Sequence, residues 1–124
     1  MLDLHDEMVA LIRALDTRGI PYALCGGLAM AVHGVPRATI DIDLLVLPES
    51  LEDVLGAVGG LGFTLGALPM SFANDRVRIR RVSKPDPELG DLLTLDLVLA
   101  GPELAEVWQD RQRVEWAAGP LWVV

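Results

Sequence analysis

The sequence is poor in several residue types that would point to particular classes of protein. Among its 124 residues are a single cysteine (Cys25) and a single lysine (Lys84), and 5% are aromatic. One cysteine excludes an intrachain disulfide, which fits a reducing compartment. No apolar run approaches the roughly 20 residues of a membrane-spanning helix. The first residues lack the basic and then apolar pattern of a signal peptide. We therefore expect a cytoplasmic protein without membrane segments.

The charge and apolar content describe an acidic globular protein. Ten basic residues against eighteen acidic ones give a formal net charge of −8, which disfavours general binding to nucleic acid. Apolar residues make up 52% and charged residues 23% of the chain, as in folded domains. We expect one domain spanning residues 1–124.

Hydrophobic periodicity predicts both helices and strands. Asp3 is a plausible N-cap of the first helix, and Gly19 is a plausible stop. The expected helices span residues 3–18, 28–33, 48–61 and 103–112. The expected strands span residues 22–25, 38–47, 76–82, 91–100, 113–117 and 121–124, with a loop at 84–88 and an ambiguous segment at 63–70. This order predicts an α+β (α/β-like) fold, with a mixed β-sheet flanked by helices.

The segment from Cys25 to Val46, CGGLAMAVHGVPRATIDIDLLV, suits a metal-bound nucleotide. Gly26 and Gly27 allow a tight turn and a close approach of backbone amides to a ligand. A helix beginning at the next residue would present unpaired N–H groups, a usual setting for phosphate. Asp41 and Asp43 would share one face of a strand, about 7 Å apart. Such carboxylates repel each other unless a cation lies between them, and Mg²⁺ is the usual one.

The strand that carries these two acids has two different faces. Asp41, Asp43 and Leu45 share one face, so the start of this face should border a cleft and its end should be covered. The opposite face, which we expect to meet the core, carries Ile40, Ile42, Leu44 and Val46.

Asp96 is a third candidate ligand. A charged residue within the apolar strand LTLDLVLA is costly unless it is ionised beside a cation or a hydrogen-bond donor. If this strand lies beside that of Asp41 and Asp43, the carboxylates could hold two Mg²⁺ ions about 4 Å apart. Asp96 would then be placed to help deprotonate a nucleophile. The alternatives are a structural Asp96 that binds a neighbouring amide, and a solvated Asp41–Asp43 pair.

These residues together resemble the nucleotidyltransferase superfamily. The resemblance rests on Gly26-Gly27, thirteen intervening residues, the Asp41-Ile42-Asp43 motif and a later strand with Asp96. The superfamily includes DNA polymerase beta, CCA-adding enzymes and aminoglycoside nucleotidyltransferases. The sequence of the motif is most similar to the small bacterial antitoxin and abortive-infection nucleotidyltransferases. The resemblance covers residues 20 to about 100.

The resemblance implies transfer of a nucleoside monophosphate from an NTP to a hydroxyl of a protein, a tRNA or a small molecule. It implies two Mg²⁺ ions, for which Mn²⁺ could substitute. By position, Gly26 and Gly27 would hold the triphosphate. Asp41 and Asp43 would bind both metals, and Asp96 the catalytic one.

Arg37 and Thr39 match a recurrent Arg-x-Thr/Ser of the smaller members and could contact phosphate. The alternative for Arg37 is a structural pair with an acid. Two features depart from the family pattern. Gly27 occupies a position where Ser is frequent in the superfamily, although CCA-adding enzymes also have Gly there. The helical C-terminal region of most relatives has no counterpart in the sequence up to Val124.

Other functional interpretations remain open. A catalytically degenerate domain could bind a nucleotide or serve as a regulatory module of a toxin–antitoxin or other two-chain system. A glycosyltransferase-type DxD is disfavoured by the short chain and by the glycine pair. Arg76, Arg78 and Arg80 form either a polyanion contact or a solvated strand face. The C-terminal hairpin offers a sheet edge for a homodimer or a partner chain.

Overall fold

The structure is a computed structural model that describes residues 3–26, 41–72, 77–88, 90, 92–116 and 119–124. Gly27, Arg37 and Thr39 lie outside the described residues, as does the helix expected at 28–33.

Helix α1 (Leu4–Thr17) forms where the periodicity predicts it. The side chain of its N-cap, Asp3, accepts a hydrogen bond from the backbone N–H of Asp6 at 3.1 Å, which satisfies one of the unpaired amides of the first turn. Gly19 follows the helix with φ +67, a conformation that glycine adopts without a Cβ clash. The predicted cap and stop are both confirmed.

The remaining helices in the described residues are short. The helix expected at 48–61 begins as a 3₁₀ turn, η1 (Pro48–Ser50), and continues as α3 (Leu51–Gly59). The helix expected at 103–112 consists of η2 (Pro102–Leu104) and α4 (Ala105–Gln109), so its predicted end was too late. None of the described helices is long and apolar enough to cross a membrane.

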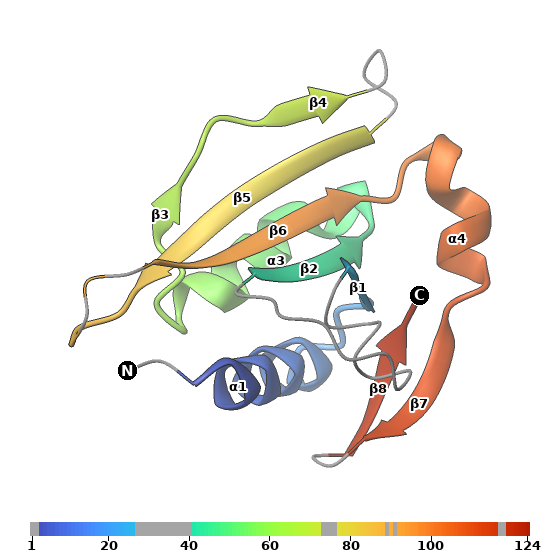
Figure 1. The fold of residues 1–124 in the computed structure, drawn as a ribbon. Coiled ribbons are helices and arrows are strands. Elements are labelled where there is room, and N and C mark those ends of the chain that lie inside the picture. The colour runs from blue at the N-terminus through green and yellow to red at the C-terminus, as the bar shows by residue number, and fades with distance from the viewer. Residues whose placement is uncertain (1–2, 27–40, 73–76, 89, 91, 117–118) are drawn as a thin grey trace.

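The described strands form one mixed sheet (Figure 1). Their bounds are β1 (Ala23–Cys25), β2 (Asp41–Val46), β3 (Leu65–Gly66), β4 (Met70–Phe72), β5 (Val77–Pro85), β6 (Leu92–Leu99), β7 (Gln112–Trp116) and β8 (Gly119–Val123). Their order is β3-β5-β6-β2-β1-β8-β7, and β4 also pairs with β5. The β2–β6 and β1–β8 pairs are parallel, and the other pairs are antiparallel. The predicted mixed sheet flanked by helices is confirmed.

Strand β5 is longer than the sequence suggested. The loop predicted at 84–88 is wrong at its start, because Lys84 pairs with Leu93 and Pro85 with Leu92 across an antiparallel ladder. Proline is tolerated there because, among the described strands, β5 pairs on one side only beyond Ser83, so Pro85 lies at an edge of the sheet.

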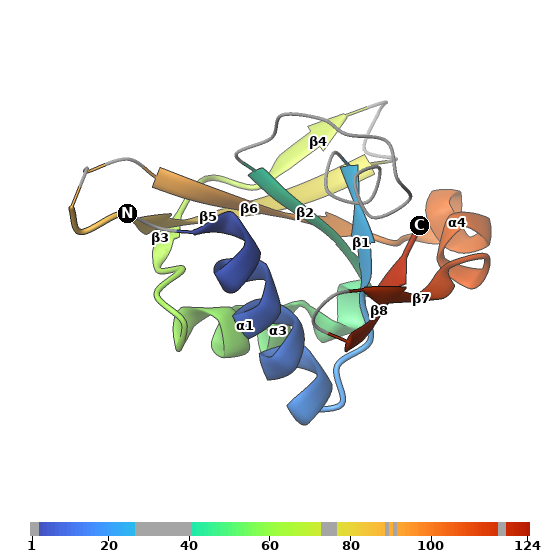
Figure 2. The ribbon, with the colours of Figure 1, turned by 60° about the horizontal axis from the view of Figure 1, so that its bottom comes forward.

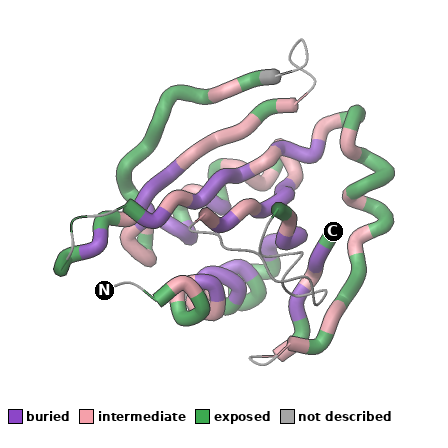
Figure 3. Tube along the Cα trace, viewed as in Figure 1, coloured by how far each residue is buried: buried purple, intermediate pink, exposed green. Residues whose placement is uncertain are grey.

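Helices α1 and α3 cover one face of the sheet (Figure 2). The core between them contains the expected apolar face of β2 and the matching face of β6 (Figure 3). Ile42, Leu44, Leu95 and Leu97 in this core have 0% exposure. Because strand side chains alternate, burial of these residues directs their neighbours Asp43 and Asp96 to the other face.

Candidate functional site

The acidic residues of β2 and β6 lie on the face that α1 and α3 leave uncovered. In the parallel β2–β6 ladder, Asp43 lies directly opposite Asp96, and Asp41 lies opposite Thr94. Neighbouring strands are about 4.8 Å apart, so paired residues project side by side. Asp41 shares this face two residues earlier on β2. The structure therefore places the three predicted carboxylates on one face of the sheet, with Asp43 and Asp96 in adjacent positions.

The face changes from polar to apolar along β2, as expected. Leu45, two residues beyond Asp43, is 3% exposed and packs with Ala23 and Ala100 in a second apolar cluster. Trp108 of α4 and Trp122 of β8 pack against this cluster. This face of β2 is thus covered at its C-terminal end, and the acids lie on the uncovered part nearer its N-terminal end.

Burial and charge both act on Asp43. Burial raises the pKa of its carboxyl above the ordinary value, and the neighbouring charges of Asp96 and Asp41 raise it further. The guanidinium of Arg81 opposes this shift. The ionised form of Asp43 is therefore disfavoured on balance, which is the situation that a bound cation would relieve.

Arg81 is the component of the site that sequence reasoning missed. It lies opposite Asp96 in the β5–β6 ladder. Its Nε donates to Oδ1 of Asp96 at 2.8 Å, and a terminal nitrogen donates to Oδ2 at 3.1 Å. Asp96 is 8% exposed, so the bidentate pair satisfies a buried carboxylate. Alternation places Arg81 on the same strand face as the apolar Val77 and Ile79, but it does not indicate that this face meets Asp96.

Gly26 closes the site from β1. Cys25 pairs with Asp43 in the β1–β2 ladder, and Gly26, which follows β1, has φ +69. A Cβ on residue 26 would overlap Oδ2 of Asp43 and lie 3.0 Å from its Cγ. Glycine is therefore required both by the backbone conformation and by the closeness of the carboxylate. Of the predicted phosphate-contacting residues, Gly26 is the one within the described chain.

Asp43 and Asp96 suit a divalent cation in the chemistry of their donor atoms and in their adjacent positions. An ionised carboxylate has about four lone-pair positions, and the two bonds from Arg81 use one on each oxygen of Asp96. Asp96 thus keeps acceptor capacity toward Asp43, and oxygen ligands of this kind are those that Mg²⁺ binds. Among the described residues, the group of three whose ligand atoms all lie within 4.8 Å of one another is a different one, Asp3, His5 and Asp6, which is exposed at the start of α1. The carboxylates of Asp41, Asp43 and Asp96 are not gathered that closely in the structure.

The fold has counterparts among solved structures. The chain superposes on TM1012, a candidate nucleotidyltransferase of Thermotoga maritima, with a TM-score of 0.69 and 12% identity, covering 100% of this chain and 80% of that one. This is the nucleotidyltransferase fold. The antibiotic-resistance factor ANT(2'')-Ia matches with a TM-score of 0.54 and 23% identity over 98% of this chain and 66% of that one. JHP933 from Helicobacter pylori matches with a TM-score of 0.54 and 17% identity over 97% and 50%.

These similarities concern the fold. No protein-family model and no curated protein sequence matches the chain. The chain spans about two thirds of ANT(2'')-Ia and half of JHP933.

Proposed function

We propose that the protein is a Mg²⁺-dependent nucleotidyltransferase that transfers a nucleoside monophosphate from an NTP to a hydroxyl acceptor. The observation that carries this proposal is the in-register pairing of Asp43 with Asp96, with Asp41 on the same face. The shared fold supports it. Mn²⁺ would substitute for Mg²⁺. The acceptor class (protein, tRNA or small molecule) and the NTP are left open.

In this proposal, Asp41 and Asp43 would hold both cations, and Asp96 would help to hold the catalytic one. The bound cations would lower the pKa of the acceptor hydroxyl and neutralise charge on the leaving pyrophosphate. The hydroxyl oxygen forms a bond to the α-phosphorus, and the bond from that phosphorus to the bridging oxygen breaks. Asp96 accepts the hydroxyl proton, and pyrophosphate leaves.

The glycine turn positions the triphosphate. The turn at Gly26 lies against Asp43, so a phosphate bound to the backbone there would be adjacent to the acidic residues. We propose that Gly27, Arg37 and Thr39 contribute further phosphate contacts. We also propose that the protein is cytoplasmic. The edge of the C-terminal hairpin would pair with a second copy of the chain or with a partner chain.

Radiolabelled NTPs test this function directly. The purified protein is incubated with each labelled NTP, MgCl₂ and a bacterial extract, and transfer to protein, RNA and small molecules is measured separately. Asp43→Asn should abolish transfer. Asp53→Asn removes an exposed acid from α3, which covers the opposite face, and should leave transfer unchanged. Transfer that persists in Asp43→Asn at the wild-type rate would disprove the proposal.

A non-catalytic module is the second candidate. The observation that favours it is that both oxygens of Asp96 already accept hydrogen bonds from Arg81. Such a module, acting within a toxin–antitoxin or other two-chain system, would bind an NTP without releasing pyrophosphate. Calorimetry that detects NTP binding, combined with an absence of pyrophosphate release, would identify it.

A further inference from the structure

We propose that Arg81 is a positioning residue that fixes the Asp96 carboxylate and weakens cation binding to it, making Asp96 the weaker cation ligand of the acidic site. This inference rests on the proposed function, because it assigns Asp96 to a cation. It concerns the affinity of the site for the cation, so a measurement of metal binding tests it without enzymatic turnover.

The geometry fixes the orientation of Asp96. Arg81 binds both carboxylate oxygens through two nitrogens of a planar guanidinium, at 2.8 and 3.1 Å. A bidentate pair of this kind defines the plane of the carboxylate as well as its position. The Asp96 side chain is 11% exposed and the Arg81 side chain is 43% exposed, so the arginine reaches the carboxylate from the solvent side.

The charge of Arg81 acts against a cation at Asp96. The guanidinium remains protonated, so it places a fixed positive charge against the carboxylate that a divalent ion would share. Half of the lone-pair positions of Asp96 are also used by Arg81. Both of these hydrogen bonds go to Asp96, whereas Asp43 lies on the adjacent strand, one strand further from Arg81, which makes the two ligands unequal.

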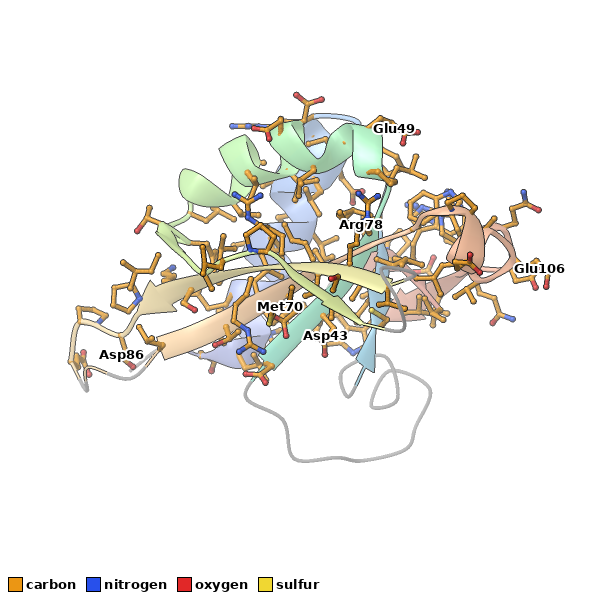
Figure 4. The ribbon with its side chains drawn as sticks, turned by 90° about the horizontal axis from the view of Figure 1, so that it is seen from above. Asp43, Glu49, Met70, Arg78, Asp86 and Glu106 are labelled. Carbon is orange, nitrogen blue, oxygen red and sulfur yellow. The ribbon has the colours of Figure 1, made fainter. Side chains whose placement is uncertain are left out.

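The chain offers a matched control on the same strand. Arg78 and Arg81 are three residues apart on β5, so their side chains project from opposite faces. Arg78 pairs with Leu99 and lies on the side of the sheet that carries α1 and α3, whereas Asp43 lies on the other side (Figure 4). Arg78→Gln therefore makes the same change in net charge away from the acids.

Mn²⁺ binding to the full chain, followed by electron paramagnetic resonance and calorimetry, tests the inference. Arg81→Gln should tighten Mn²⁺ binding on the order of tenfold, because a positive charge next to the ion is removed. Arg78→Gln should change it less than about twofold, because its charge is distant and screened. Arg81→Lys keeps the charge and should restore affinity close to that of the wild type.

A double-mutant cycle assigns the effect to Asp96. In the Asp96→Asn background, Arg81→Gln should no longer change Mn²⁺ affinity. Thermal unfolding of each variant shows whether it is folded, and Arg81→Met provides the charge-removing measurement if Arg81→Gln does not fold. The inference would be overturned if Arg81→Gln and Arg78→Gln bound Mn²⁺ equally well, or if Arg81→Gln bound it more weakly than the wild type. It would also be overturned if Arg81→Gln still changed Mn²⁺ affinity in the Asp96→Asn background, or if no variant bound Mn²⁺. Loss of NTP transfer with this binding pattern intact would contradict the proposed function instead.

Discussion

The α-carbon of Gly26 lies so close to the carboxylate of Asp43 that no side chain fits between them. The backbone at Gly26 also has φ +69. The turn after β1 and the acid of β2 are therefore two parts of one site. A substitution at residue 26 should disturb the acid as well as the turn.

Gly26→Ala should destabilise the protein more than the same substitution at another left-handed glycine. Gly19 has φ +67, and among the described residues no atom lies within 4 Å of where its Cβ would be, so Gly19→Ala isolates the backbone cost of about 1–2 kcal/mol. At Gly26 the overlap with Asp43 should add about 1–3 kcal/mol. Urea unfolding of both variants measures the difference, and equal losses would contradict the close contact.

Asp43→Asn should stabilise the metal-free protein at pH 7. The folded-state pKa of Asp43 is raised by burial and then by Asp96 and Asp41, so ionising it costs stability. The stability associated with the protonated carboxyl is complete below its ordinary pKa and is lost as pH rises through the raised value. Thermal unfolding in EDTA should therefore show a higher Tm for Asp43→Asn at pH 7 and a smaller difference near pH 3.5.

Added Mn²⁺ provides the complementary measurement for the same pair of proteins. It should raise the Tm of the wild type, because the ion binds the folded state, and should have little effect on Asp43→Asn. An equal rise in both proteins would place the ion away from Asp43.

Local patterns in the sequence predicted those parts of the structure that depend on local periodicity. The alternation around Asp41 and Asp43 identified the core face of β2, and the Asp3 cap and the Gly19 stop bounded α1. The expectation that Asp96 meets these acids depended on a stated condition, that its strand lies beside β2. The β2–β6 ladder meets this condition.

Features that depend on long-range pairing could not be derived from local patterns. Arg81 became part of the site through the register of β5 on β6, which periodicity does not specify. The parallel pairing of β1 with β8 joins Leu24 to Val123, and no local signal indicates it. The length of β5 was missed for the same reason, because its end at Pro85 is set by the partner strand.

Cys25 should be unreactive in the folded protein. Burial, followed by the charges of Asp43 and Asp96, raises the pKa of its thiol to about 12. At pH 8, about one thiol in ten thousand is then ionised, and the thiolate is the reactive form. Alkylation by iodoacetamide should be at least about a hundredfold slower than in urea-unfolded protein. Comparable rates in the two states would show that the thiol is accessible and unperturbed.

The contact between Glu7 and Lys84 should contribute measurably to the attachment of α1 to the sheet. The Nζ atom of Lys84 donates to both carboxylate oxygens of Glu7, at 2.9 and 2.8 Å, although the residues are far apart in sequence. The side chains of Lys84 and Glu7 are 22% and 13% exposed, so solvent screens this pair less than a surface pair. Loss of one partner leaves the other charge partly buried.

Glu7→Gln should therefore lower the free energy of unfolding by about 2 kcal/mol, because the ammonium of Lys84 loses its counter-charge while it stays beside the Phe63 ring. Glu7→Gln combined with Lys84→Met should recover part of this loss, since neither charge is then left unpaired. Glu52→Gln, on the exposed surface of α3, should change stability by less than about 0.5 kcal/mol. Urea denaturation of the four variants, including Lys84→Met alone, gives the coupling energy. A coupling energy near zero would show that α1 is held by its apolar face alone.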